Sequence, residues 1–534
     1  MRGIIKKTGL IIGCATLIVV SFLFVFHAAV LAQEAFQKAP LNPKFEEYMA
    51  KQNAAELNGA PLAAVSPEGR PTGLIPSPID FTHLRESASL KAQPEIIIRR
   101  LPSSFDLRTE NKVTPVKDQG NCGSCWAFAA LASLESTIMP TTTDFSEQFI
   151  IDTHGFSWGP CAGGFELMAI ADIAAHGAVA QNSNTYEYLW PTGPVPALPQ
   201  SVWANAYLNQ VELIPAGLDS KGNPVTVYTK EAVYGSGAGG SGVAIGFLVD
   251  QSSPYLVTAR NGDECYYNNT DSQGDGHEVT IVGWNDSYPK SNFGITPPGN
   301  GAWLVKNSWG TDWGNSGYFW LSYYDKSVNP DAYVYNMASS TPYNWTYQYD
   351  PLGWTQSRGF GDSSTAWMAN VFKAQSQGKM IRAVGLYTYS PNTTYTVKIY
   401  SNCPTSGDGA TPSVDPVGGT LLVSDTGMFY SAGYNTHTLS KAVAVSPGAN
   451  FSVVVELTDS TGYEYPIAVQ ATQGNSYPPY TGPSPRSTVI MGQSYISPTG
   501  AEGTWTDLAV FHPTATSYYY TGDRVCLKAF ATAK

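Results

Sequence analysis

Apolar and polar residues alternate most regularly in the C-terminal part of the chain. Residues 380–389, 394–400 and 451–457 alternate with a period of two, the pattern of strands that bury one face. Turn-forming residues such as Pro391 and Asn392 separate these runs. The pattern predicts an all-β region of almost 200 residues beyond about residue 340, most simply a β-sandwich.

A helical pattern follows Cys125. Residues 126–139 are rich in strong helix formers, and Leu131, Leu134 and Ile138 recur at three- and four-residue spacing. This spacing predicts a buried helix that begins at Cys125.

A third pattern surrounds His277. Residues 277–284 form a β-type apolar run, so the imidazole is expected at the start of a rigid strand. The proline-rich residues 287–299 then predict a loop between two strands. A lone histidine is usually structural, so His277 gains functional weight only from partners elsewhere in the chain.

The N-terminus indicates the compartment. Three basic residues precede an uncharged apolar run at residues 8–26, and small residues at 30–32 fit a signal-peptidase cleavage site. We expect residues 1–32 to be a signal peptide and the protein to be secreted or held at the cell surface. An uncleaved membrane anchor is the alternative, because the run is nearly long enough to span a bilayer.

Composition limits the classes of function. The 534 residues include 42 acidic and 30 basic ones, a formal charge of −12, and only 13% are charged. The lack of a basic excess argues against nucleic acid as a partner, and 43% hydrophobic residues allow several buried cores. Many turns are expected from 51 glycines and 37 prolines, which argues against an all-helical fold.

Six of the seven cysteines follow the expected signal peptide. In an oxidising compartment an even count suggests three disulfides. Cys122 and Cys125 form a C-x-x-C pair, so a redox motif or half of a zinc site are alternatives. No second pair follows at zinc-ligand spacing, which argues against zinc.

Three short segments together resemble the papain family of cysteine peptidases. The first, residues 119–128, contains Q-G-N-C-G-S-C-W around Cys125. The second is G-H-E-V around His277, and the third is K-N-S-W-G around Asn307. The resemblance implies an α+β fold with two lobes over residues 101–340, a helical lobe and an antiparallel β-barrel lobe.

The resemblance also implies the role of each residue. Cys125 would be the nucleophile, activated as a thiolate by the helix N-terminus and by His277. Asn307 would orient the imidazole, and Gln119 would donate to the oxyanion. Trp309 would shield the histidine. Trp313 would form a wall of the cleft on the side of the leaving group. The alternative is that Trp313 is an ordinary core tryptophan.

A further segment, C-A-G-G-F at residues 161–165, resembles the strip that binds the substrate backbone beside the nucleophile. By that match, substrate would contact Gly163, Gly164, Phe165 and Gly276. Glu166 would line the pocket for the residue second from the cut and favour a basic side chain there.

The same match pairs Cys122 with Cys161 in a disulfide. Of the remaining thiols, we expect Cys403 to pair with Cys526 and Cys265 to be free, although sequence leaves the other pairings open.

Residues 33–100 resemble a propeptide, rich in proline, alanine and polar residues. An extended segment lying through the cleft would silence the enzyme during secretion. Residues 96–98 are three isoleucines followed by two arginines, so this stretch is the candidate for both the inhibitory strand and the maturation site.

Beyond the peptidase, residues 341–534 resemble the lectin-like domain of certain prokaryotic cell-surface cysteine proteases. Segments 349–354, 367–372 and 390–395 carry the resemblance. Their aromatic residues would either stack on cell-surface or cell-wall glycans or fill the sandwich core. A calcium ion is compatible with such a domain, with Asp350 as a candidate ligand; catalysis itself requires no cofactor.

Two classes of function follow. The favoured one is a secreted cysteine endopeptidase, made as a zymogen, that cleaves extracellular or cell-surface proteins and is first bound by its own propeptide. The alternative is a surface- or glycan-binding protein that uses the papain-like domain as a non-catalytic scaffold.

Overall fold

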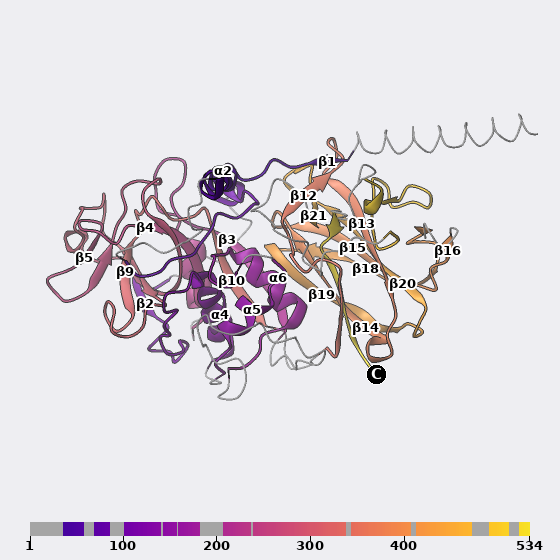
Figure 1. The fold of residues 1–534 in the computed structure, drawn as a ribbon. Helices are drawn as coiled ribbons and strands as arrows, with labels where there is room; N and C mark the ends of the chain where they lie inside the picture. The colour runs from indigo at the N-terminus through magenta and orange to yellow at the C-terminus, as the bar shows by residue number, and fades with distance from the viewer. Residues whose placement is uncertain are drawn as a thin grey trace, which may run out of the picture.

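The computed structural model describes residues 36–57, 69–85, 101–139, 143–156, 159–181, 207–235, 239–337, 343–406, 413–471, 491–511 and 523–534 (Figure 1). The expected signal peptide at 1–32 and the isoleucine and arginine stretch at 96–100 lie outside these residues.

A layer of helices forms one lobe of the first domain. Its first helix begins at Cys125, as the spacing predicts, and buries Leu131 and Leu134. The second follows Ser146, whose hydroxyl accepts a hydrogen bond of 3.1 Å from the Phe149 backbone N–H. The helices are α4 (Cys125–Ile138), α5 (Glu147–Thr153) and α6 (Glu166–His176).

A sheet of thirteen described strands lies against these helices, and α4 packs on three of its central strands. The predicted apolar run around His277 is one of them, and the predicted loop at 287–299 joins it to the next strand. The central strands in sheet order are β3 (Leu208–Pro215), β10 (Asp331–Met337), β4 (Val243–Val249), β7 (Asp275–Asn285), β8 (Ala302–Lys306) and β9 (Tyr318–Ser322).

The second domain is a sandwich, as predicted. The three alternating segments are the strands β14 (Met380–Thr388), β15 (Thr393–Ser401) and β20 (Asn450–Thr458). Apolar side chains of one layer, such as Val397 and Val455, pack in one core with Val384 and Leu386 of β14 from the large sheet. In order, that layer consists of β18 (Thr420–Phe429), β15, β20, β13 (Thr365–Lys373), β22 (Ser494–Ser497) and β23 (Thr506–Asp507).

The remaining elements complete both domains. They are β1 (Gln37–Lys38), α2 (Pro43–Leu57), β2 (Ser104–Asp106), α7 (Val227–Tyr234), β5 (Leu256–Thr258), β6 (Glu264–Tyr266), η1 (Lys290–Asn292), β11 (Trp345–Tyr347), β12 (Gln356–Gly359), η2 (Ser376–Gly378), β16 (Thr405–Ser406), β17 (Ser413–Val414), β19 (Ala432–Ala444), β21 (Ile467–Gln470), η3 (Leu508–Phe511), β24 (Arg524–Val525) and β25 (Leu527–Thr532).

The large sheet crosses from one domain into the other. Strand β3 of the first domain pairs antiparallel with β19 of the second, and β19 continues to β14, β25 and β11. The register places Val211 opposite Tyr434, which is fully buried at this junction. A hydrogen-bonded ladder therefore joins the two domains, in addition to the packing of side chains.

The described residues before residue 101, 36–57 and 69–85, are called here the N-terminal segment. It lies across both domains (Figure 1). Its strand β1 adds to the edge of β12 in the second domain. Farther along, Leu74 forms a bridge with Gly164 of the first domain. The segment therefore contacts both halves of the protein.

One of the sequence predictions for the thiols needs correction. Cys403 and Cys526 are not bonded to each other; both are free and buried. Cys403 packs with Val414 and Val454 in a small cluster of the six-stranded layer, whereas Cys526 belongs to the interdomain core. Counting cysteines could not place them, because each behaves as a small apolar core residue.

The calcium ligand predicted at Asp350 is also wrong. The carboxylate is fully buried and forms an ion pair with Lys528, at 2.5 Å between Oδ2 and Nζ. A lysine ammonium in contact with this carboxylate takes the place that a cation would fill. Among the described residues, no cluster of three or more His, Cys, Asp or Glu side chains has a geometry suited to a metal ion.

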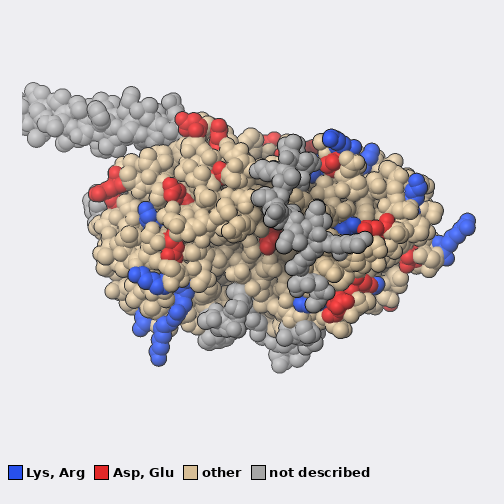
Figure 2. All heavy atoms as spheres, turned by 180° about the vertical axis from the view of Figure 1, so that it is seen from behind, with Lys and Arg blue, Asp and Glu red and all other residues tan. Residues whose placement is uncertain are grey.

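The surface carries few charges. Figure 2 shows isolated acidic and basic side chains spread over a mainly uncharged face, consistent with a charged fraction of 13%. No helix in the described part of the chain is both long and apolar enough to cross a membrane.

Candidate active site

Cys125 is the first residue of α4, and its side chain is fully buried. A disulfide between Cys122 and Cys161, the pair that the resemblance implied, ties the preceding loop to the loop before α6. A parallel bridge between Gly123 and Ala162 adds a second connection between these loops. The thiol is therefore held at a fixed place at the start of a rigid helix.

His277 and Asn307 come from neighbouring strands. His277 is the third residue of β7, and Asn307 follows directly after β8. The histidine Nε2 lies 2.8 Å from the Asn307 Oδ1, which also accepts the backbone N–H of Ser308. Because this oxygen accepts, Nε2 carries the proton and Nδ1 keeps a lone pair. Nδ1 is buried and has no hydrogen-bond partner among the described residues.

Trp309 covers the imidazole. Its ring stacks on that of His277 with centroids 4.6 Å apart and an angle of 18° between the planes. It is 1% exposed, so it excludes water from the His277–Asn307 bond. Trp313 is partly buried and meets Trp309 edge-on, with centroids 4.8 Å apart.

Gln119 lies beside the start of α4 and is fully buried. Its Nε2 donates to the Cys122 carbonyl at 2.8 Å and lies 3.4 Å from the carbonyl of Thr72 in the N-terminal segment. The hydroxyl of Ser308 donates to its Oε1 at 2.6 Å. Ser308 therefore orients the amide so that its N–H groups face the cleft, a role that sequence reasoning did not assign although the residue stands in the K-N-S-W-G segment.

The N-terminal segment runs between the loop before α6 and the start of β7, a space called here the cleft. Gly164 donates its N–H to the Gly73 carbonyl at 2.9 Å and accepts the Ile75 N–H at 2.8 Å. On the opposite wall, the Gly276 carbonyl accepts the N–H groups of Gly73 and Leu74 at 3.1 and 3.0 Å. The predicted glycine positions therefore line a groove that holds an extended chain by its backbone.

Side chains at these positions would close the cleft. A Cβ atom on Gly276 would lie 2.1 Å from the Leu74 carbonyl oxygen, and one on Gly163 would lie 2.7 Å from the Gly73 oxygen. Trp309 also holds the segment, since its Nε1 donates to the Pro71 carbonyl at 2.8 Å. The structure thus places residues 71–75 in the cleft, whereas the sequence had suggested residues 96–98.

Burial controls the protonation of the central pair. It raises the pKa of Cys125 to about 12, against backbone hydrogen bonds from Glu278, Trp126 and Leu74. It lowers the pKa of His277 to about 4, although the bond to Asn307 acts in the other direction. Burial in the full-length chain thus disfavours both charged forms, the thiolate of Cys125 and the imidazolium of His277.

Two residues expected to contact substrate lie deeper than predicted. Phe165 is 1% exposed and packs edge-on against Phe156 in the core. Glu166 is 2% exposed, and one of its oxygens accepts a hydrogen bond from the Tyr335 hydroxyl. Sequence reasoning missed Glu278, a second buried carboxyl that directly follows His277 and interacts with both Glu166 and Cys125.

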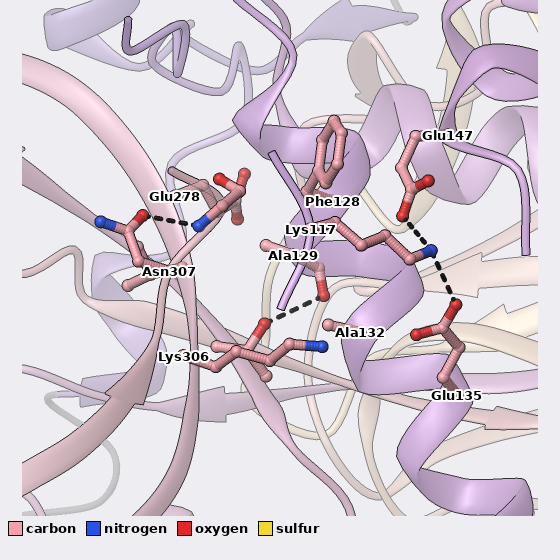
Figure 3. A pocket seen from close by; sticks show the side chains of 12 residues that line it. Lys117, Phe128, Ala129, Ala132, Glu135, Glu147, Glu278, Lys306 and Asn307 are labelled. Atoms are coloured by element: carbon pink, nitrogen blue, oxygen red, sulfur yellow. Dashed lines mark hydrogen bonds and ion pairs between the residues drawn. The ribbon is translucent and has the colours of Figure 1, made fainter. Parts of the chain in front are cut away.

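A buried network of charges ties the two lobes together behind the cleft. Figure 3 shows Lys117 reaching between Glu135 of α4 and Glu147 of α5, with Lys306 of β8 beside them. The Lys306 ammonium donates to Thr114 at 2.9 Å, and burial lowers its pKa to about 8. Since Lys306 precedes Asn307, the network fixes β8 relative to α4, and so the amide relative to the thiol.

Comparisons of the sequence agree with this arrangement. Residues 101–340 match the family described as Papain family cysteine protease, and residues 346–531 match the family described as Lectin like domain. Mouse cathepsin K is 30% identical over 249 residues, which are 45% of this chain and 64% of the relative. The rice oryzain gamma chain is 31% identical over 225 residues, 41% of this chain and 54% of the relative. The chain thus spans little more than half of the length of such relatives.

Comparisons of the structure extend the likeness to both domains. The crystal structure of the cysteine protease and lectin-like domains of Cwp84, a surface layer associated protein of Clostridium difficile, aligns with a TM-score of 0.69 at 20% identity, covering 94% of this chain and 99% of that one. A structure of a Cwp84 variant after propeptide cleavage aligns with a TM-score of 0.62 at 22% identity, covering 81% of this chain and 100% of that one. At this identity the likeness concerns the fold.

Proposed function

Because the chain carries a papain-family cysteine peptidase domain followed by a lectin-like domain, we propose that it is a secreted cysteine endopeptidase made as a zymogen. The observation that carries the proposal is the bond between His277 Nε2 and Asn307 Oδ1, which leaves Nδ1 buried and without a hydrogen-bond partner among the described residues. The backbone of Glu278, the next residue after His277, hydrogen-bonds to the Cys125 thiol, so imidazole and thiol are neighbours.

The mechanism follows from these positions. His277 Nδ1 takes the proton of Cys125, and the sulfur attacks the carbonyl carbon of the scissile peptide bond. The carbonyl oxygen becomes an anion beside the Gln119 Nε2–H and the Cys125 backbone N–H. His277 then protonates the leaving amine as the C–N bond breaks, which leaves a thioester on Cys125. A water molecule, deprotonated by His277, hydrolyses the thioester and restores the thiol.

Asn307 and Trp309 support the proton transfers. The amide oxygen of Asn307 fixes the imidazole so that Nδ1 is always the atom that accepts and returns the proton. The indole of Trp309 keeps water away from this hydrogen bond, which strengthens it in a low dielectric.

Inhibition of the zymogen rests on the N-terminal segment. Residues 71–75 occupy the cleft with hydrogen bonds to both walls, and Thr72 lies at the amide that would stabilise the oxyanion. Substrate cannot bind while this backbone is in place. Removal of the segment would open the cleft and bring solvent to Cys125, which weakens the desolvation that raises the pKa of its thiol.

Location and natural substrate belong to the same proposal. The expected signal peptide and the fold likeness to a surface layer associated protein favour a place outside the cell or on its surface, where protein substrates would be met. Five aromatic residues of the lectin-like domain were candidates for stacking on glycans. Trp354 and Phe372 are buried, and the other three are only partly exposed and pack on the hydrophobic cores: Tyr349, Trp367 and Tyr395. This favours a structural role for them over glycan binding.

The test compares thiol reactivity and cleavage before and after removal of the N-terminal segment. We expect the matured wild type to cleave a fluorogenic peptide and to be labelled at Cys125 by an epoxide thiol inhibitor, and Cys125→Ala to do neither. Gln119→Ala should lower kcat by about 100- to 1,000-fold, the usual effect of one oxyanion donor. A matured wild type without activity, or an active Cys125→Ala variant, would contradict the proposal.

A further inference from the structure

A groove over the strands β2, β7, β8 and β9 has no part in the mechanism described above. It has a volume of about 390 Å³, within the range of about 300–1,000 Å³ that is usual for small-molecule sites. Strands β2 and β9 lie at the end of the first domain that is away from the lectin-like domain (Figure 1). This space is called here the β2–β9 groove.

A row of residues across the sheet lines the groove. Asp106 lies opposite Gly283, and Leu304 lies opposite both Gly283 and Trp320. Opposed residues of antiparallel strands point to the same face, so Asp106, Leu304 and Trp320 share one face of the sheet. Because Gly283 has no side chain, a hollow is left between Asp106 and Leu304.

One side of the groove is aromatic. Trp320 is partly buried, and its ring stacks on that of Tyr288 with centroids 4.4 Å apart and an angle of 22° between the planes. Tyr288 belongs to the loop at 287–299, and its hydroxyl donates to Asp263 at 2.8 Å. The loop therefore fixes the indole beside the groove, and Phe105 adds a second partly buried residue to the lining.

The other side of the groove is polar, and its charges are paired. Arg108 donates to both carboxylate oxygens of Asp106, at 3.0 Å from Nε and 2.7 Å from Nη2. Asn285 accepts the backbone N–H of Ser287 with Oδ1, so its Nδ2–H groups are the donors available to a ligand. Ser104, which is exposed, lies opposite Asn285 on the neighbouring strand.

These two sides determine the chemistry of a ligand. It needs an apolar face for Trp320 and hydroxyl groups that can bind Asp106 and Asn285. It needs no charge, because Arg108 neutralises the carboxylate. An extended peptide fits less well, since β7 and β8 pair with other strands on both of their edges and leave no backbone edge open. A sugar ring fits, because one of its faces carries only C–H groups and its rim carries hydroxyls.

We propose that the β2–β9 groove binds a neutral oligosaccharide, with one sugar ring stacked on Trp320. Asp106 accepts hydrogen bonds from the sugar hydroxyls, and Asn285 donates to them. The site is separate from the cleft and from the lectin-like domain, whose candidate aromatic residues pack on its cores. It would hold the peptidase domain against a surface that carries glycans.

The test uses the full-length Cys125→Ala protein, which stays uncut, and isothermal titration calorimetry with three neutral trisaccharides: cellotriose, maltotriose and chitotriose. We expect at least one of them to bind with a Kd of about 1 mM or lower. Trp320→Ala should weaken this binding at least about tenfold, through loss of the stacked ring. Ser104→Trp leaves the core contacts in place and fills the groove, so it should abolish binding.

The matched control is Trp367→Ala in the lectin-like domain. Trp367 is also partly buried and has the Lys398 ammonium 4.8 Å from its ring centroid, so the variant loses a comparable indole in the other domain. Its affinity for the sugar should equal that of the parent protein. Loss of binding in Trp367→Ala alone would place the sugar on the second domain and overturn the proposal.

Other outcomes would also contradict the assignment. One is the absence of binding by all three sugars to the parent protein. Another is binding that persists in Ser104→Trp, the variant that decides if Trp320→Ala melts below the parent protein and loses binding through unfolding. Reduced and alkylated lysozyme, an unfolded chain without sugars, should not bind; if it binds in place of the sugars, the groove is a polypeptide site.

Discussion

The N-terminal segment contacts the two domains in different ways. In the cleft of the peptidase domain its contacts are mainly between backbone atoms, from Gly73, Leu74 and Ile75 to Gly164 and Gly276. On the lectin-like domain the short ladder between β1 and β12 is joined by contacts between aromatic side chains, which the cleft lacks. There the rings of three residues pack on partners from the second domain: Phe36 on Phe360, Phe81 on Trp354, and His83 on Tyr389.

The two kinds of contact have different roles: those in the cleft block substrate, and those on the lectin-like domain hold the N-terminal segment in place. Net stabilisation by a backbone hydrogen bond is about 0.5–1.5 kcal/mol, and water or a substrate can replace it. Burying an aromatic side chain stabilises by about 1.5–3 kcal/mol, and only a matching surface can provide it. We infer that the lectin-like domain contributes more to binding of the N-terminal segment than the cleft does. The second domain would therefore take part in inhibiting the first.

The largest effect on stability is expected from removing the contact between Phe81 and Trp354. Phe81 is 1% exposed and meets Trp354 edge-on with ring centroids 5.5 Å apart. Phe81→Ala should lower the free energy of unfolding of the full-length chain by about 3–5 kcal/mol, through lost burial and the cavity left behind. Chemical denaturation of the Cys125→Ala background, which stays uncut, measures it.

The matured protein provides the control for this prediction. Once the segment has been cleaved off and removed, Phe81→Ala and wild type are the same molecule and should unfold together. A full-length variant as stable as wild type would show that the aromatic contact does not hold the segment.

The next effect concerns the cleft. Gly73 has a φ of +147°, and a Cβ atom there would lie 2.4 Å from the carbonyl oxygen of Gly123. Gly73→Ala should therefore push the segment out of the cleft while the holding contacts remain. We expect Cys125 of the full-length chain to react with iodoacetamide about 30- to 140-fold faster, since about 2–3 kcal/mol of strain corresponds to that ratio.

Gly69→Ala is the matched control, because its Cβ atom would meet only the flexible side chain of Gln251. Its alkylation rate should equal that of wild type. The same reaction on Cys125→Ala accounts for labelling of the other thiols. If Gly73→Ala reacts no faster than Gly69→Ala, the backbone contact is not what closes the cleft.

The same contrast explains what the sequence could and could not predict. The thiol, imidazole and amide of Cys125, His277 and Asn307 could be proposed from short motifs, because each role requires one kind of side chain in a fixed local setting. The strands of the sandwich could be predicted because apolar and polar residues alternate in their sequences, although burial itself alternates only in β15. The occupant of the cleft could not be predicted, since a backbone contact demands almost nothing of side chains. The β-branched run at 96–98 has the stronger strand pattern.

Contacts between distant parts of the chain were equally out of reach. The ladder between β3 and β19 depends on which sheet edges meet in space. The placement of Glu278 and Asp331 on either side of Gly246 depends on the register of β7, β4 and β10. Neither leaves a periodic signal within one segment of sequence.

The smallest expected effect is on the pH dependence of stability. It distinguishes the contact of His83 with the lectin-like domain from the contacts in the cleft. His83 donates from Nε2 to the Tyr389 carbonyl at 3.0 Å, and its Nδ1 is buried with no partner in the part of the chain that the structure describes. Burial lowers the pKa of His83 to about 4, against the attraction of Asp459 and Asp80. Because the folded chain binds this proton less readily than the unfolded chain, stability falls as pH drops below about 6.5 and levels off below about 4.

We expect His83 to cost the full-length chain about 2 kcal/mol of stability between pH 7 and pH 5, from the pKa difference at 1.36 kcal/mol per unit. His83→Gln, which keeps a donor for Tyr389, should lose this component of the pH dependence. His176→Gln, at the end of α6 and paired with Asp172, is the control and should retain it. His277 in the cleft also has a lowered pKa and is unchanged in both variants, so the difference between their denaturation curves isolates the holding contact. Equal pH slopes in wild type and His83→Gln would mean that acid loosens the segment only at the cleft.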